Sequence, residues 1–282
     1  MNHKVPIFLH IPKNAGTYIV TANQKLLEQN LHKFSKTKSL AKNFLVDING
    51  STLLRIFCAI DETTLARIQS CMTYKIDKLN AVIDYEKFLY FVESNDIELF
   101  SIVVEPGYFW GHSKFSTNLL PAFSAAFKIC SMMGASYFCY TILRPIAERC
   151  KSIFSYLNSE LSIHEPNHKS ITSNSFEEYV DSDELETNWI ASSMLGASCV
   201  TESQFNIICG LLDKFQVYDI SQADQCIYDI FNACFRSINL NIQEKSLNQN
   251  KNTNNIPLYN QQLIDKINQK NIWDYRLYKK FT

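Results

Sequence analysis

Glycine and proline are scarce in this chain, with seven of each among 282 residues. So low a content argues against a low-complexity chain and against an all-β sandwich, which needs many turns. An excess of one charge is also lacking, because 27 basic residues balance 28 acidic ones. The overall charge therefore gives no indication of nucleic-acid binding, and we expect no nucleic-acid partner.

Cysteine motifs and long apolar runs are missing as well. The nine cysteines include no Cys-x-x-Cys pair and no Cys/His cluster at metal-ligand spacing, so we predict no metal. Their number is odd and many lie in apolar stretches, which favours buried, reduced thiols over disulfides: Cys58, Cys130, Cys139, Cys209 and Cys234. No signal peptide and no apolar run of about 20 residues is recognisable, so we expect a cytoplasmic protein without a membrane span.

The hydrophobic content is 46%, enough for a sizeable core, and it is arranged in alternating patterns. Unbroken apolar runs of strand length begin at Ile7 and cover Leu99–Glu105 and Tyr137–Leu143. Such runs are typical of strands buried on both faces of a parallel sheet. Helical patterns follow them, over Thr17–Gln29, Leu119–Met133 and Ile146–Leu157. This alternation predicts a three-layer α/β fold, with a central mainly parallel sheet flanked by helices.

The remaining segments are expected to belong to one domain over residues 1–282. Between Leu31 and Asp96 the pattern predicts helices over Glu62–Cys71 and Asp84–Glu93, and a strand near Phe44–Ile48. From about residue 176 the chain is predicted to be largely helical. The expected helices there are Phe176–Val180, Glu184–Leu195, Glu202–Leu212, Asp224–Ser237 and Leu258–Gln269, with a short strand over Phe215–Tyr218.

The first strand runs into Pro-Lys-Asn-Ala-Gly-Thr (12–17), which precedes the first helix. A strand, a tight turn and a helix N-terminus in this order make an anion site, because unpaired N–H groups and the helix dipole attract negative charge. Gly16 permits close approach of a ligand, Thr17 offers a hydroxyl and Lys13 a positive charge. The lysine precedes the glycine, so this is not a Walker A loop. The alternative is an ordinary strand–turn–helix with a surface lysine.

This loop resembles the 5′-phosphosulfate loop of sulfotransferases that use 3′-phosphoadenosine 5′-phosphosulfate (PAPS). The similarity is greatest to the branch of heparan sulfate 2-O-sulfotransferase and related bacterial proteins. A second stretch, Leu143–Ser152, resembles the 3′-phosphate motif of that family, although Pro145 stands where the family has Asp or Asn. The resemblance implies a P-loop-like fold in which Arg144 and Ser152 bind the 3′-phosphate. It places the 5′-phosphosulfate against the loop residues Lys13, Asn14, Ala15, Gly16, Thr17 and Tyr18.

Gly111-His112 resembles the Gly-His of the 2-O-sulfotransferase branch, which implies that His112 is the catalytic base. An imidazole suits the removal of a proton from an acceptor hydroxyl, although a lone histidine is more often a packing residue. Some relatives carry a further histidine where this chain has Trp110. The resemblance also implies Glu105 as a reserve base, because other sulfotransferase branches use a glutamate in this region. It implies Lys13 as the second catalytic residue, because its charge would stabilise the bridging oxygen of the phosphosulfate.

The resemblance implies transfer of a sulfuryl group from PAPS to a hydroxyl of a glycan or glycolipid-like acceptor, leaving 3′,5′-ADP. The variable segment Leu31–Asp96 is expected to contact the acceptor. The alternatives are a non-catalytic nucleotide-binding or scaffold protein with this fold, and a P-loop-like kinase. Weaker resemblances, for which we expect structural roles, cover Asn188–Gly196 (with Ser192 at the family's arginine position), Lys214–Asp219 and Asp274–Tyr278.

Overall fold

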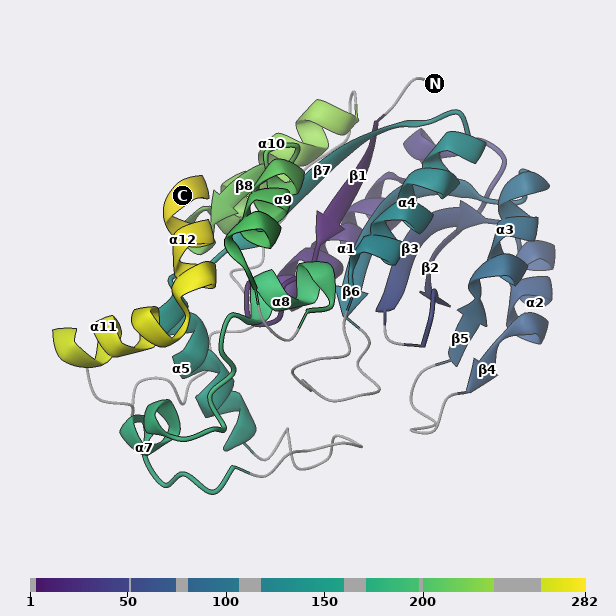
Figure 1. Cartoon of the computed structure of the whole chain (residues 1–282). Helices are drawn as coiled ribbons and strands as arrows, with labels where there is room; N and C mark the ends of the chain where they lie inside the picture. The colour runs from purple at the N-terminus through teal and green to yellow at the C-terminus, as the bar shows by residue number, and fades with distance from the viewer. Residues whose placement is uncertain are drawn as a thin grey trace.

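The computed structural model describes residues 4–50, 52–74, 81–106, 118–159, 171–197, 200–235 and 260–282. A single sheet crosses it in the strand order β4-β5-β2-β3-β6-β1-β7-β8 (Figure 1). Strands β6, β1, β7 and β8 run parallel, whereas β3 is antiparallel to both of its neighbours. The strands are β1 (Lys4–Leu9), β2 (Leu40–Asp47), β3 (Thr52–Ile60), β4 (Thr73–Tyr74), β5 (Ala81–Asp84), β6 (Glu98–Pro106), β7 (Ser136–Leu143) and β8 (Gln216–Asp219).

Helices cover both faces of this sheet, so the predicted three-layer α/β architecture is confirmed. One face packs against α1 (Gly16–Phe34) and α10 (Ala223–Cys234). The other packs against α2 (Glu62–Cys71), α3 (Tyr85–Glu93), α4 (Leu120–Met132), α8 (Trp189–Leu195) and α9 (Glu202–Leu212). In Figure 1, α4, α8 and α9 lie in front of the sheet and α1 behind it. A smaller cluster joins α5 (Ile146–Leu157), α7 (Phe176–Asp181) and α11 (Gln261–Lys270), and α12 spans Ile272–Phe281.

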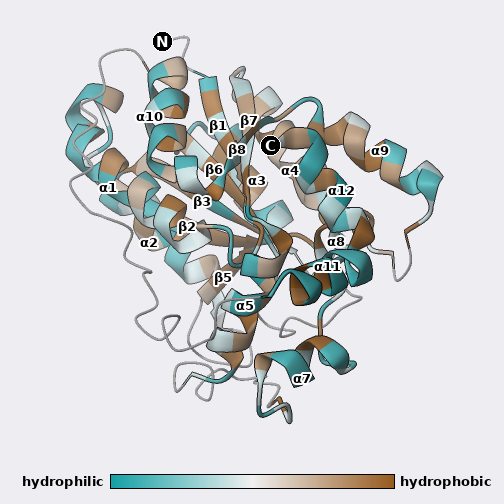
Figure 2. Cartoon of the chain, turned by 90° about the vertical axis from the view of Figure 1, so that its left-hand side faces the viewer, coloured by the Kyte–Doolittle hydropathy of each residue, from teal (hydrophilic) through white to brown (hydrophobic). Residues whose placement is uncertain are grey.

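The first strand is buried on both faces, as its unbroken apolar run predicts. Ile7 and Leu9 belong to the core beneath α4, whereas Phe8 faces α1 and packs on Tyr140, with ring centroids 5.1 Å apart. Hydrophobic residues are concentrated on the strands and on the helix faces turned towards them (Figure 2). The thiols predicted to be buried are buried: Cys58, Cys130, Cys139, Cys209 and Cys234. No helix among the described residues has the length and apolar composition needed to cross a bilayer.

Most predicted elements agree with the structure, and the differences have physical reasons. The helices α2, α5 and α9 have their predicted bounds, whereas α1 continues to Phe34. The helix predicted over Glu184–Leu195 is wrong in its first half, because α8 begins only at Trp189. Asn188, the preceding residue, has a left-handed φ of 51° and cannot continue a helix. Its backbone N–H and side-chain oxygen are instead engaged by Asn271 and Trp273.

The segment between Leu31 and Asp96 is part of the central sheet rather than a peripheral addition. It supplies β2, β3, β4 and β5, and β3 pairs with β6 along its length. The sequence did not predict β3. Of the aromatic side chains on α3, Phe88 and Phe91 are buried in the core, whereas Tyr90 is exposed.

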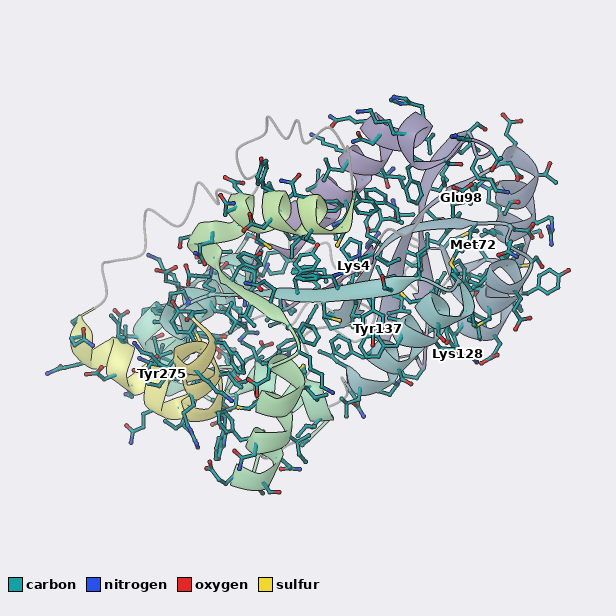
Figure 3. All side chains as sticks on the ribbon, turned by 90° about the horizontal axis from the view of Figure 1, so that it is seen from above. Lys4, Met72, Glu98, Lys128, Tyr137 and Tyr275 are labelled. Atoms are coloured by element: carbon teal, nitrogen blue, oxygen red, sulfur yellow. The ribbon has the colours of Figure 1, made fainter. Side chains whose placement is uncertain are left out.

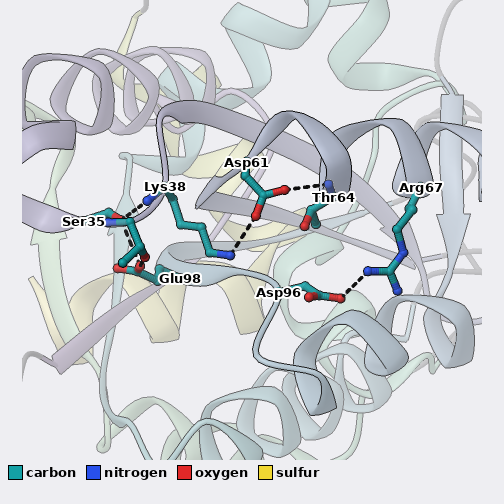
Figure 4. Close-up of polar contacts among 8 residues, drawn as sticks. Ser35, Lys38, Asp61, Thr64, Arg67, Asp96 and Glu98 are labelled. Atoms are coloured by element: carbon teal, nitrogen blue, oxygen red, sulfur yellow. Dashed lines mark hydrogen bonds and ion pairs between the residues drawn. The ribbon is translucent and has the colours of Figure 1, made fainter.

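The amino-terminal edge of the sheet carries ionic contacts that join helices to strands. Lys4, Glu98 and Tyr137 mark this edge in Figure 3, at or next to the starts of β1, β6 and β7. The Ser35 hydroxyl donates to Glu98 over 2.8 Å, and Arg67 pairs with Asp96 at 2.8 Å (Figure 4). These contacts have structural roles, because they tie the end of α1 and the middle of α2 to this edge.

Hydrogen bonds involving two residues of the Asp274–Tyr278 stretch hold the last helix, α12, against the rest of the fold. The buried carboxylate of Asp274 accepts hydrogen bonds from the backbone N–H groups of Ile190 (3.0 Å) and Ala191 (2.9 Å) in the first turn of α8. The Tyr278 hydroxyl donates to Asp219 at the end of β8 over 2.8 Å. These contacts show structural roles for Asp274 and Tyr278.

We expect Asp274→Ala to lower the free energy of unfolding by about 2–4 kcal/mol, because two buried N–H groups lose their acceptor. Urea unfolding followed by circular dichroism measures this change. The matched control is Asp265→Ala, which removes an exposed carboxylate from α11 and should change the value by less than about 0.5 kcal/mol. Equal effects of the two substitutions would contradict the stabilising role of the hydrogen bonds that Asp274 accepts.

Candidate functional site

The predicted anion loop forms a tight turn between β1 and α1. Lys13 and Ala15 have left-handed φ values of 67° and 62°, which is unusual for residues other than glycine. Ala15 immediately precedes α1, and no side chain caps this 19-residue helix. The N–H groups of its first turn, which have no partner within the helix, therefore face the end of the loop. Together with the helix dipole they can attract an anion to this position.

Two hydrogen bonds hold this loop against β7. The Asn14 amide, which is fully buried, donates to the carbonyl of Ile142 over 3.0 Å. One step earlier, the Thr141 hydroxyl donates to the carbonyl of Leu9 over 2.9 Å. The side chain of Asn14 therefore positions the loop instead of pointing into open space.

The second predicted segment begins at the same edge of the sheet. Leu9 pairs with Thr141 in the parallel ladder, and Lys13 and Arg144 follow this pair by four and three residues. Lys13 reaches α5, where its Nζ lies 3.1 Å from the centroid of the Tyr156 ring. Ser152 lies one turn before Tyr156 on α5, and residues four apart share one helix face. The structure thus brings the loop, the start of the Arg144 segment and the Ser152 face of α5 together.

A buried arginine makes a second link between the loop and α5. The Arg149 Nε donates to the carbonyl of Pro12 over 3.4 Å, and its Nη2 lies 3.6 Å from Glu186. The guanidinium also stacks over Trp189 at 5.1 Å. Arg149 therefore has a structural role: it forms an ion pair with Glu186 and holds the loop backbone at Pro12.

Two other predicted site residues are engaged within the fold. The Tyr18 hydroxyl donates to Asp224 of α10, and burial together with this carboxylate raises the pKa of Tyr18. Tyr18 can thus offer a ligand its backbone N–H, while its side chain joins two helices. Glu105 is fully buried, and its two oxygens accept from the Arg55 guanidinium at 2.8 and 3.2 Å. To act as the reserve base, Glu105 would have to give up this pair.

His10 is a residue of this site that sequence reasoning did not single out. It follows β1 directly, is almost fully buried, and donates its backbone N–H to Val104 over 2.9 Å. Burial lowers the pKa of His10, as do the charges of Arg55 and Lys13, against the opposing effect of Glu105. The one signal in the sequence was a polar side chain at the end of an apolar strand, next to the loop motif.

The predicted catalytic base His112 and its neighbours Trp110 and Gly111 lie outside the described residues.

An open, mainly apolar groove of about 410 Å³ lies away from the loop, between α4, β7, β8, α8 and α9. None of the predicted site residues lines it. Tyr137, near the start of β7, is one of its lining residues and is labelled in Figure 3.

No family model matches the chain, and no curated protein matches it. The geometry of the loop, β7 and α5 is therefore the basis for assigning a function.

The left-handed conformation of Ala15 makes a prediction about stability. Ala15→Gly should raise the free energy of unfolding by about 0.5–1 kcal/mol, because glycine adopts this conformation without the steric cost of a Cβ. Chemical denaturation measures the change. Ala41→Gly, in the regular strand β2, is the matched control and should lower stability by a similar amount. Destabilisation by both substitutions would contradict the described loop geometry.

Proposed function

We propose that this protein is a PAPS-dependent sulfotransferase with a P-loop-like fold, acting on a hydroxyl of a glycan or glycolipid-like acceptor. One observation carries the proposal: the loop and the Arg144 segment lie side by side at the carboxyl ends of the paired strands β1 and β7. Ligands of α/β proteins bind at this edge of the sheet. The parallel order β6-β1-β7-β8, with α1 directly after β1, supports the same proposal.

The residues at this edge fit the two charged ends of PAPS. The N–H groups at the start of α1 and the Lys13 ammonium suit the 5′-phosphosulfate. Arg144 suits the 3′-phosphate, because a guanidinium binds phosphate through two parallel hydrogen bonds, and the Ser152 hydroxyl can donate another. The left-handed residues Lys13 and Ala15 fix the loop before any ligand binds, which reduces the entropic cost of binding.

PAPS, when bound, supplies a sulfuryl group that is transferred as its bond to the 5′-phosphate oxygen breaks. Lys13 would stabilise the negative charge that develops on that oxygen, and the contact with Tyr156 keeps its ammonium beside the loop. His112 is proposed to accept the proton of the acceptor hydroxyl as the new oxygen–sulfur bond forms. The Leu31–Asp96 segment, which supplies β3 next to β6, is proposed to contribute to acceptor binding.

Nucleotide binding tests the proposed 3′-phosphate site. By isothermal titration calorimetry, the protein should bind 3′,5′-ADP at least about tenfold more tightly than ADP, and Arg144→Ala should abolish that preference. The control is Arg67→Ala, which removes an arginine from the opposite edge of the sheet and should leave both affinities unchanged. Equal affinity for the two nucleotides in the unaltered protein would refute the proposal.

Turnover tests the proposed chemistry. Transfer of label from PAPS to a panel of glycans should be detectable, and His112→Ala should reduce kcat by about a hundredfold or more without changing the affinity for 3′,5′-ADP. His32→Ala, at an exposed position near the end of α1, is the control. Tight binding of 3′,5′-ADP without turnover would favour the non-catalytic alternative, and phosphoryl transfer from ATP would favour the kinase.

A further inference from the structure

A row of polar side chains crosses the α1-covered face of the sheet next to the anion loop. Glu105 on β6 pairs with Arg55 on β3, and Arg55 Nη1 donates to Asn43 on β2 over 3.2 Å. Asn43 in turn donates to Gln24 of α1 over 2.8 Å. Because the buried Glu105 carboxylate has a cationic partner, its charge is balanced beside a site that is to hold an anion.

His10 lies at the end of this row, between Glu105 and the loop. The register pairs Leu9 with Val104, so the next residue on each strand brings His10 opposite Glu105. On its other side the imidazole touches the start of α1: a Cβ added to Gly16 would lie 1.7 Å from the His10 Nε2 and 2.0 Å from its Cδ2. The ring therefore occupies the space in which any side chain at position 16 would have to lie, and α1 rests on it.

The charge state of this ring matters for the loop. The charged groups that face it are Lys13 from the loop, Arg55 from β3 and Glu105 from β6. Burial is the largest effect and lowers the pKa of His10, so the imidazole is neutral at pH 7. A proton on this ring would place a third cation beside Lys13 and Arg55, out of contact with water. At low pH the protonated ring is therefore more stable in conformations that expose it to water. To reach these conformations, α1 and the loop must move away from the ring.

We propose that His10 is a positioning residue that makes anion binding by the loop sensitive to pH. The neutral imidazole supports Gly16, and through it the N–H groups at the start of α1, in the arrangement that binds the anion. Protonation of the imidazole releases this support and weakens binding. The inference rests on the proposed function only for the identity of the ligand, since the contact between His10 and Gly16 is present without one.

A double-mutant cycle without ligand tests the contact. Gly16→Ala should lower the Tm by about 4 °C or more, whereas the same change in a His10→Ala background should lower it by less than half as much, because the smaller side chain leaves room for the new Cβ. Additive effects would overturn the proposal. If His10→Ala fails to fold, the cycle is run with His10→Asn.

Proton NMR of the imidazoles tests the charge state. The chain has six histidines, and the His10 resonance is identified by its absence from the spectrum of His10→Asn. We expect the pKa of His10 in this titration to lie well below the ordinary value of a histidine imidazole, about 6.5. A titration midpoint of His10 at or above that ordinary value would overturn the proposal.

The pH dependence of 3′,5′-ADP affinity tests the coupling. Between about pH 7.5 and about pH 5, the affinity of the unaltered protein should fall at least about fivefold more than that of His10→Asn. Protonation of the nucleotide phosphates affects both proteins alike and cancels in the ratio. A constant ratio would overturn the coupling. If 3′,5′-ADP binds at no pH, the proposed function fails, and the cycle and the NMR titration still decide the role of His10.

Discussion

The parallel pairing of β1 with β7 is the constraint on which the candidate site depends. It brings together two segments of chain that are 128 residues apart, and the hydrogen bond from Asn14 to Ile142 fixes their relative position just beyond the ladder. Without this pairing, the loop would not lie beside the segment that follows β7. With it, the first turn of α1 and the end of β7 share one edge of the sheet, and α5 closes that edge through Lys13 and Tyr156.

Buried charges support the loop from two sides. Arg55 and Glu105 lie beneath it on the strands, with His10 between them and Gly16, while Arg149 and Glu186 lie on the side of α5. Buried ion pairs contribute little net stability, because desolvation offsets their attraction. What they provide here is a fixed geometry: Arg149 holds the loop backbone at Pro12, and Glu105 lies opposite His10, on which Gly16 rests.

The sequence predicted the parts of this structure that depend on local pattern. The unbroken apolar runs correctly indicated β6 and β7, and the loop and α5 were located from their residues alone. Prediction from the sequence failed where the local structure depends on residues that are distant in the chain. Arg55 interrupts the apolar pattern of β3 and so concealed this strand, because the partner that balances its charge, Glu105, is 50 residues away in the chain. In the same way, the left-handed turn at Asn188 is stabilised by Asn271, 83 residues further along the chain.

Contacts around the loop explain how its strained conformation is maintained. Left-handed conformations at Lys13 and Ala15 each cost on the order of 1 kcal/mol, and such strain persists only where the surroundings fix the backbone. Here the surroundings are Asn14 tied to β7, Pro12 tied to Arg149, and Gly16 resting on His10. The first two contacts join the loop to β7 and α5, which are distant in the sequence, and the third joins Gly16 to His10 across the turn. The strained loop is therefore maintained by this whole edge of the sheet. Folding fixes the N–H groups at the start of α1 in position before a ligand binds.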